Sequence, residues 1–309
     1  MKKVVLCIVG PTASGKTSLA LLVAKKLLGE IISADSRQVY KYLDIGTAKP
    51  TPEQRREVKH YFVDELEPSE VFSAGEFGKR GRQVVDIIFR RKKVPIVVGG
   101  SGLYIQSLID GFFEGPSADY EIRQRLYRRL HKEGAEALLR ELRAVDLASA
   151  AKMLPTNTRR IVRALEVYEL IGVPLSKLQE QKVNIDFTTL MVGLEWDRKQ
   201  LYERINRRVD GMLKGGLLDE VRKLMSLGHS EKTTALQTVG YLEALWHLRG
   251  EIDYDTMVDL MKRNTRRFAK RQLTWFRGEK RIHWFPIEDE AELSSIAEKV
   301  VKLYRSTVT

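Results

Sequence analysis

The segment that decides the fold is VVLCIVGPTASGKTSLALLVAKKLL, residues 4–28. It begins with six consecutive apolar residues, Val4–Val9, the pattern of a parallel strand buried on both faces. Residues 10–15 form a turn-rich loop, and residues 16–28 show helical periodicity that stops at Gly29, a residue typical of a helix C-terminus. A buried strand, a tight loop and a helix in direct succession indicate the first unit of an open α/β sheet.

The loop in this segment matches G-x-x-x-x-G-K-[ST] in full, in the strand-to-helix context that the pattern requires. The backbone N–H groups of such a loop and the N-terminus of the next helix form an anion-binding nest. Lys16 reaches terminal phosphate oxygens, and the Thr17 hydroxyl can ligate Mg²⁺. We therefore predict that a di- or triphosphate is bound by Gly10, Pro11, Thr12, Ala13, Ser14, Gly15, Lys16 and Thr17. The motif does not identify the reaction, since kinases, NTPases and other phosphate-handling enzymes all carry it.

The rest of the chain extends the α/β pattern around a helical stretch. Apolar runs predict further strands at 31–33, 94–98, 188–194 and 282–285, and Ser73–Glu76 has the form of a capping box that opens a helix. Residues 119–171 show helical periods and few β-branched runs. We predict an α/β core with a phosphate-loop parallel sheet, made of residues 1–113 and 186–309, and an all-helical insertion domain at 114–185.

The positive charge of the chain is concentrated near its C-terminus. The 309 residues carry a formal net charge of +12, and the window 262–281, KRNTRRFAKRQLTWFRGEKR, holds nine basic residues and one acid. On a helix, the arginines 263, 267 and 271 would form one stripe beside a second stripe at 262, 266 and 270. This pattern is typical of a polyanion-binding surface, although a solvated helix face is the ordinary alternative.

Composition excludes several other classes of protein. Cys7 is the one cysteine, so no intramolecular disulfide can form and a reducing compartment is expected. No apolar run approaches the ~20 residues that span a bilayer. The five histidines fall in no metal-ligand spacing. We therefore expect a cytoplasmic protein with no membrane partner.

Two features argue against an ordinary NTPase. The apolar run 94–98 ends in Gly99-Gly100, whereas an NTPase usually has a metal-binding aspartate after such a strand. An acid follows the second predicted strand instead, at Asp35. A carboxylate near a phosphate loop is a candidate general base or an outer ligand of a metal, although Asp35 with Ser36 could also simply cap a helix.

Eight segments together resemble the tRNA dimethylallyltransferases, also called isopentenyl-tRNA transferases. They are GPTASGKT (10–17), ADSRQVY (34–40), DIGTAKP (44–50), VGGSGLY (98–104), NTRRIVRALEVYE (157–169), LDEVRKL (218–224), TVGYLE (238–243) and KRQLTWFR (270–277). They cover nearly the whole chain in order. The resemblance implies two substrates, dimethylallyl diphosphate and a tRNA anticodon stem-loop. It also implies transfer of the prenyl group to N6 of the adenosine on the 3′ side of the anticodon, with release of diphosphate.

That reaction agrees with the chemistry of the residues. The exocyclic nitrogen of adenine is a poor nucleophile, but an allylic carbon can bear positive charge if its leaving diphosphate is stabilised. The phosphate loop would then hold a leaving group instead of transferring a phosphoryl group. Lys16, and Mg²⁺ on Thr17, would neutralise the charge that develops on it.

The resemblance also implies roles for single residues. Asp35 would accept the N6 proton, Ser101 would lie near the reacting groups, and Arg222 would be a second cation on the diphosphate. The target base would have to be flipped out of a stacked loop, as enzymes acting on bases require. The residues implied to contact the tRNA are Asp35, Ser36, Arg37, Gln38, Ser101, Arg123, Arg159, Arg160, Arg163, Gln237, Lys270, Arg271, Gln272, Thr274, Trp275 and Arg277. We expect the enzyme to act as a monomer.

Some of these residues could have purely structural roles, and other functions of the protein also remain open. Arg222 could be an ordinary surface residue, and Glu166 could pair with Arg163 three positions earlier. An adenylate isopentenyltransferase acting on free AMP, ADP or ATP shares the chemistry but would not need the basic segment. A small-molecule kinase using ATP, or an RNA-binding protein with a structural nucleotide, would also fit the phosphate loop.

Overall fold

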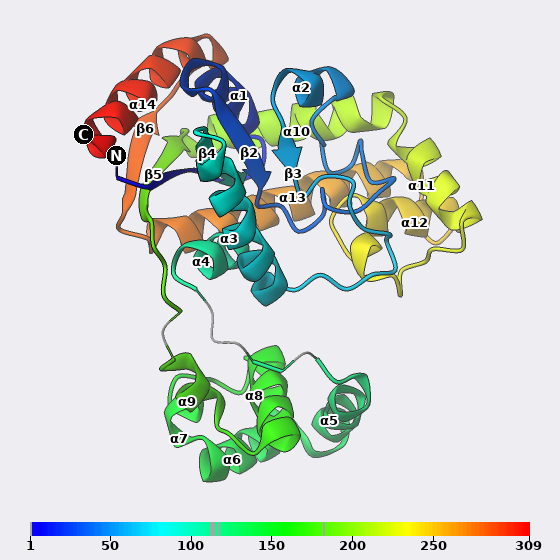
Figure 1. Cartoon of the computed structure of the whole chain (residues 1–309). Helices are drawn as coiled ribbons and strands as arrows, with labels where there is room; N and C mark the ends of the chain where they lie inside the picture. The colour runs from blue at the N-terminus through cyan, green and yellow to red at the C-terminus, as the bar shows by residue number, and fades with distance from the viewer. Residues whose placement is uncertain (1, 112–114, 117, 182) are drawn as a thin grey trace. The chain divides into compact units, whose positions relative to one another are not determined.

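The structure is a computed structural model that describes residues 2–111, 115–116, 118–181 and 183–309. The chain divides into two compact units, one of Met1–Ile109 with Ile185–Thr309 and one of Asp110–Asn184 (Figure 1). The insertion was expected at 114–185, and its first residue, Glu114, lies outside the described residues. None of the described helices is long and apolar enough to cross a membrane.

The first unit is built on a six-stranded sheet in which every strand pairing is parallel (Figure 1). The strands are β1 (Val4–Val9), β2 (Gly29–Ser33), β3 (His60–Tyr61), β4 (Val94–Gly99), β5 (Thr188–Glu195) and β6 (Ile282–Pro286), in the order β3-β2-β4-β1-β5-β6. The predicted α/β class and its five longer strands are confirmed. The two-residue strand β3 was missed because a run that short has no periodicity.

Alternate residues of β1 face two separate hydrophobic cores. Val5, Cys7 and Val9 lie in the core on one face, whereas Val4, Leu6 and Ile8 lie in the core on the other. Helices therefore cover both faces of the sheet. They are α1 (Lys16–Leu27), α2 (Pro52–Glu57), α3 (Ala74–Arg90), α4 (Gly102–Ile109), α10 (Arg198–Lys214), α11 (Leu217–Ser226), α12 (Tyr241–Leu248), α13 (Tyr254–Arg277) and α14 (Leu293–Val308), with the short 3₁₀ helices η1 (Thr234–Leu236) and η2 (Glu290–Glu292).

The turn from α1 into β2 differs from the expectation. The residue in the left-handed conformation is Leu28, with φ 53°, and Gly29 is already the first residue of β2. A Cβ atom on Gly29 would lie 2.5 Å from the Ile96 side chain. Gly29 is therefore needed because β2 and β4 approach closely, and not because it ends the helix.

The second unit is all-helical and has a core of its own. Its helices are α5 (Tyr120–Glu133), α6 (Ala135–Val145), α7 (Leu147–Ala150), α8 (Thr158–Ile171) and α9 (Leu175–Gln179). Leucines of α5 and α6 pack against the apolar face of α8. Asp146 caps α7 by accepting the Ser149 N–H at 3.0 Å. The core also contains a charge, since Glu166 on α8 is fully buried.

Glu166 joins three parts of this unit. Its carboxylate accepts from the Asp119 N–H (2.8 Å), from Arg123 (2.8 Å) and from Arg163 (3.0 Å). Both arginine side chains remain about one-third exposed. Glu166 thus holds the start of α5 against α8.

We predict that Glu166→Ala destabilises α8 locally. The substitution leaves a backbone donor and two guanidinium groups without their acceptor, although water can reach the guanidinium groups. The free energy of opening of α8, measured by native-state hydrogen exchange, should fall by about 2 kcal/mol. Glu180→Ala, which removes an ion pair with both partners about two-thirds exposed, is the control and should have no measurable effect. Equal protection of α8 in the two variants would contradict this role of Glu166.

Candidate active site

The phosphate loop lies between the end of β1 and the start of α1, as the sequence predicts. Ala13 and Gly15 have φ values of 63° and 88°. Left-handed residues within a tight loop turn successive N–H groups toward one side, which is the geometry of an anion nest. The first turn of α1, with Lys16 and Thr17, continues the nest.

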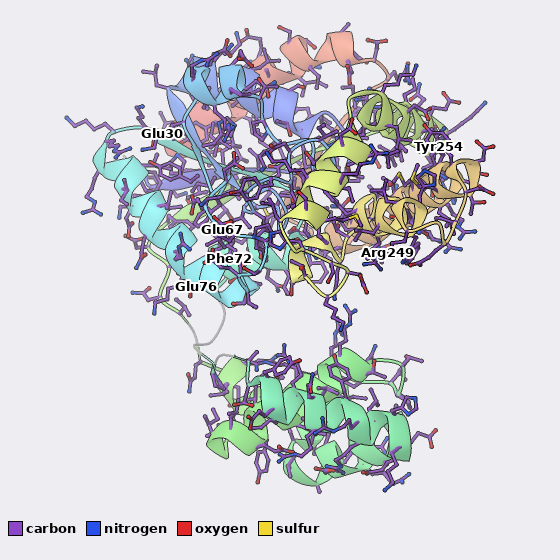
Figure 2. All side chains as sticks on the ribbon, turned by 90° about the vertical axis from the view of Figure 1, so that its right-hand side faces the viewer. Glu30, Glu67, Phe72, Glu76, Arg249 and Tyr254 are labelled. Carbon is purple, nitrogen blue, oxygen red and sulfur yellow. The ribbon has the colours of Figure 1, made fainter. Side chains whose placement is uncertain are left out.

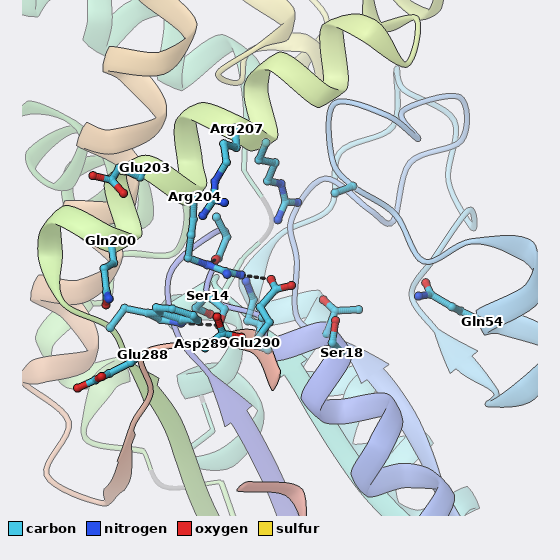
Figure 3. A pocket seen from close by; sticks show the side chains of 17 residues that line it. Ser14, Ser18, Gln54, Gln200, Glu203, Arg204, Arg207, Glu288, Asp289 and Glu290 are labelled. Atoms are coloured by element: carbon cyan, nitrogen blue, oxygen red, sulfur yellow. Dashed lines mark hydrogen bonds and ion pairs between the residues drawn. The ribbon is translucent and has the colours of Figure 1, made fainter. Parts of the chain in front are cut away.

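The carbonyl groups of this loop are bound by side chains from another part of the chain. The Trp196 indole donates to the Ser14 carbonyl at 2.8 Å, and Arg204 Nε donates to the Ala13 carbonyl at 2.9 Å (Figure 3). The Arg204 guanidinium also lies 4.1 Å from the centre of the Trp196 ring and pairs with Glu290. These donors satisfy the carbonyl groups, so the loop can direct its N–H groups to a ligand. Sequence reasoning missed both residues.

A cavity of about 660 Å³ opens at the loop and is bordered by α10. Its lining includes Lys16, Thr17, Arg207 and Arg208. Arg204 and Arg207 of α10 are labelled in Figure 3. The Nε atom of Arg208 is buried and makes no hydrogen bond within the described part of the chain. A buried guanidinium with an unsatisfied donor is a strong attractor for an anion. Arg208 is therefore a candidate phosphate ligand that the sequence pattern did not single out.

The cations that line this cavity repel one another. Burial, helped by the charge of Arg208, lowers the pKa of Lys16 to about 8, and Asp35 partly opposes that shift. Burial also lowers the pKa of Arg208, although an arginine at neutral pH stays charged. A bound anion would reverse the shift on Lys16 because an opposite charge favours the protonated form.

Asp35 and Ser101 lie together beside this cavity. Asp35 follows β2, and its Oδ1 atom accepts the N–H groups of Arg37 (2.8 Å) and Gln38 (3.4 Å). Ser101 follows β4; its N–H donates to the Ala34 carbonyl, and its Oγ accepts the Ser36 N–H, both at 3.2 Å. The negative charge of Asp35 acts to raise the pKa of both Lys16 and Arg208, so Asp35 lies near these two cations. The structure therefore brings the predicted residues Lys16, Asp35 and Ser101 together at the carboxyl ends of adjacent parallel strands, where α/β sheets bind ligands.

An aromatic cluster joins the segment 62–77 to α4. Phe62, Phe72, Phe77 and Tyr104 contact one another, and the rings of Phe77 and Tyr104 stack 4.6 Å apart. The Tyr104 hydroxyl donates to the carbonyl of Phe72 at 2.9 Å; Phe72 is labelled in Figure 2. Burial raises the pKa of Tyr104, so it remains a hydrogen-bond donor at neutral pH.

The side chain of Gln38 is engaged within the protein. Its amide donates to the carbonyls of Thr47 and Ala48, both at 3.2 Å, and its oxygen accepts from Ser33 at 2.9 Å. Gln38 thereby ties the Asp35 loop to the DIGTAKP segment. The contact with tRNA that the resemblance implies for Gln38 would require the side chain to exchange these bonds.

Glu220 is a second anchor of the DIGTAKP segment that sequence reasoning missed. Its carboxylate accepts the N–H groups of Asp44 (2.9 Å), Ile45 (2.7 Å) and Gly46 (3.2 Å), and the Tyr241 hydroxyl (2.6 Å). A Cβ on Gly46 would lie 2.5 Å from the Tyr241 ring. Three of the segments that carry the resemblance, at 44–50, 218–224 and 238–243, are therefore held together by the hydrogen bonds of Glu220.

The structure places Arg222 apart from this arrangement. It lies on α11 with its side chain 57% exposed and pairs with Asp219 one turn earlier at 2.5 Å. It is not among the described residues that line the cavity at the phosphate loop, whereas three arginines of α10 are. The contact between Arg222 and a diphosphate that the resemblance implies therefore stays a prediction, which the position of Arg222 in this structure does not support.

Apart from Asp35, Ser36, Gln38 and Ser101, the residues expected to contact RNA fall into three groups. Arg37 donates to the Gln237 carbonyl at 3.3 Å, so these two lie together. In the helical unit Arg159 and Arg160 are exposed at the start of α8, whereas Arg123 and Arg163 bind Glu166. On α13 the exposed members are Lys270, Arg271, Thr274, Trp275 and Arg277. Gln272, by contrast, is only 8% exposed.

The metal prediction is compatible with the site. The described residues contain no group of three or more histidine, cysteine or carboxylate side chains that could hold an ion. Mg²⁺ at a phosphate needs few protein ligands, since it keeps several waters and binds phosphate oxygens. The half-buried Thr17 at the cavity wall fits such a ligand.

We predict that diphosphate binding takes up a proton. At pH 8 about half of free Lys16 is neutral, and the bound anion raises its pKa, whereas the terminal phosphate has already lost its last proton near pH 6. Affinity should be highest below pH 8 and decline above it. Calorimetry with dimethylallyl diphosphate in buffers of different ionisation enthalpy measures the uptake, which should approach half a proton at pH 8. Arg208→Gln should lower both affinity and uptake; no uptake in the wild type would contradict the assigned pKa.

Comparisons with known proteins agree with this geometry. The model of the IPP transferase family matches residues 38–279. The chain is 44% identical over 306 residues to the tRNA dimethylallyltransferase of Thermoanaerobacter sp. (strain X514), covering 96% of each chain. It is 45% identical to that of Acetivibrio thermocellus, covering 98% of this chain and 97% of the relative.

Solved structures give the same result. The tRNA isopentenylpyrophosphate transferase of Bacillus halodurans has a TM-score of 0.71 and 38% identity, covering 98% of this chain and 96% of that one. A eukaryotic dimethylallyltransferase acting on tRNA has a TM-score of 0.84 and 28% identity, covering 100% of this chain and 81% of that one. With matches of this identity over nearly its whole length, the chain belongs to the IPP transferase family, the tRNA dimethylallyltransferases.

Proposed function

We propose that this chain transfers the dimethylallyl group of dimethylallyl diphosphate to N6 of the adenosine on the 3′ side of the anticodon in a tRNA, releasing diphosphate. We further propose that it does so as a single chain in the cytoplasm. The observation that carries the proposal is the arrangement at the ends of β1, β2 and β4. There, an anion nest with the half-buried cations Lys16 and Arg208 stands beside a carboxylate and a hydroxyl on the two neighbouring loops.

The nest and its cations would act on the leaving group. As the allylic carbon–oxygen bond breaks, negative charge grows on the diphosphate, and fixed N–H groups, Lys16 and Arg208 stabilise it. Because they are in place before the reaction, they need no reorganisation when the charge develops. Mg²⁺ held by Thr17 and phosphate oxygens would supply further positive charge.

Asp35 would act on the nucleophile. As N6 bonds to the allylic carbon, it must lose a proton, and a carboxylate within reach accepts it. The two N–H groups that bind its Oδ1 atom orient the Asp35 carboxylate. Ser101, which contacts the adjacent Ser36, would lie on the same side of the base, and Ser36 and Gln38 would contact its edge.

The exposed face of α13 would hold the RNA. Lys270, Arg271, Thr274 and Arg277 share that face with Trp275, which is 41% exposed. Cations bind backbone phosphates and an exposed indole can stack on an unpaired base. Arg37 with Gln237, and the arginines at 123, 159, 160 and 163 of the helical unit, would add further contacts to the anticodon stem-loop.

A transfer assay tests this function and its rivals. The chain is incubated with dimethylallyl diphosphate labelled in the prenyl group, Mg²⁺, and either an unmodified anticodon stem-loop or AMP. We expect label in the RNA. Label in AMP alone would indicate an adenylate isopentenyltransferase, and label in neither would contradict both.

In the same assay Asp35→Asn should lower the rate by about 10²–10⁴-fold, the usual contribution of a general base. The affinity for the stem-loop should change by less than about threefold. Asp219→Asn, which alters a carboxylate 80% exposed on α11, is the matched control and should behave like the wild type. A parallel loss of rate and RNA affinity would mean that Asp35 is structural.

Replacing both Lys270 and Arg271 with alanine should weaken stem-loop binding and flatten its salt dependence. Each lost phosphate contact lowers the slope of log affinity against log salt by about 0.7–0.9. Binding of dimethylallyl diphosphate should not change. Lys299→Ala with Lys302→Ala removes the same charge from exposed positions on α14. If that control flattened the slope equally, net charge and not α13 would explain RNA binding.

A further inference from the structure

Gln272 is a buried residue of α13 whose polar neighbours in the sequence are exposed. Lys270, Arg271 and Thr274 are exposed, whereas Gln272 is 8% exposed. Two residues along a helix is a turn of about 200°, so Gln272 points away from Lys270 and Thr274. Its polar group is therefore directed into the protein and not toward an RNA bound on α13.

The carboxamide of Gln272 connects two loops of the active site. Its Oε1 accepts the Thr12 N–H at 2.9 Å, and its Nε2 donates to the Gly100 carbonyl at 3.0 Å. Thr12 lies in the phosphate loop, and Gly100 directly precedes Ser101. The orientation of the amide is determined by its partners, because the reverse orientation would oppose two donors and two acceptors.

The loop after β4 is shaped for this contact. A Cβ on Gly100 would lie 2.2 Å from Gln272 Nε2, and one on Gly102 would lie 2.2 Å from Trp275 Nε1. Only glycine allows α13 to come this close. The glycines of the VGGSGLY segment are thus explained by the packing of the KRQLTWFR segment.

The connection extends to Asp35. Ser101 binds the Ala34 carbonyl through its N–H and the Ser36 N–H through its hydroxyl, both at 3.2 Å, and Asp35 lies between those two residues. The path from Thr12 through Gln272, Gly100 and Ser101 therefore joins the loop for the leaving group to the loop for the nucleophile.

We propose that Gln272 is a positioning residue that fixes the spacing between the phosphate loop and the Asp35–Ser101 loops. The inference rests on the proposed function. The allylic carbon is held through its diphosphate by the first loop, and N6 by the others. A shift of about 1 Å between the two reacting atoms can cost a hundredfold in rate. Gln272 would then affect the transfer step and not the binding of either substrate, in contrast to the RNA contact that its sequence segment implied.

Gln272→Met tests this, since it removes both hydrogen bonds and keeps the volume. The transfer rate in a single turnover with both substrates saturating should fall at least about tenfold. The dissociation constants of the stem-loop and of dimethylallyl diphosphate, each measured alone, should stay within about threefold. Lys270→Ala, from the exposed face of the same helix, is the comparison variant and should weaken stem-loop binding, which Gln272→Met should not.

Gly100→Ala provides a second variant that leaves α13 unaltered. Its Cβ would displace the Gln272 amide, so it should reproduce the loss of rate with both affinities retained, even if Gln272→Met proved too unstable to assay. A wild-type rate in either variant, or a loss of RNA affinity in Gln272→Met as large as in Lys270→Ala, would overturn the inference. Absence of transfer by the wild type would instead reject the proposed function.

Discussion

The arrangement of this site depends on the hydrogen bonds that hold the phosphate loop from outside. A nest can offer N–H groups to an anion only if its carbonyl groups and its remaining N–H groups are satisfied elsewhere. Trp196 and Arg204 bind the carbonyls of Ser14 and Ala13, and Gln272 binds the Thr12 N–H. These three residues come from the end of β5, from α10 and from α13, so much of the first unit converges on a loop of six residues.

Charge is distributed according to the size of the anion that each region would bind. At the cavity, Lys16 and Arg208 are half-buried, and the charge of Arg208 lowers the pKa of Lys16, which suits a small anion that enters a fixed site. On α13 the cations are numerous and exposed, which suits a long polyanion bound through many weak contacts. The net charge of +12 thus combines two kinds of site, and Gln272 lies where they adjoin.

Much of the fold and part of the candidate site can be predicted from local sequence, whereas the other features of the site depend on tertiary contacts. Five strands, the phosphate loop and the basic stripe of α13 have short-range signals, because buried strands, nests and helix faces are local patterns. Nothing local distinguishes Arg204 and Arg208, which face the cavity, from Arg222, which pairs with Asp219 on an exposed face. The inward direction of Gln272, the anchoring by Glu220 and the closeness of Gly29 to Ile96 likewise depend on neighbours far away in the sequence.

The central claim is that this phosphate loop holds a leaving group and does not transfer a phosphoryl group. Dimethylallyl diphosphate carrying ¹⁴C in the prenyl group and ³²P in both phosphates tests it in one reaction with the anticodon stem-loop. We expect ¹⁴C in the RNA, ³²P only as free inorganic diphosphate, and one diphosphate released for each prenyl group transferred. Any ³²P joined to the RNA, or orthophosphate released in place of diphosphate, would contradict it.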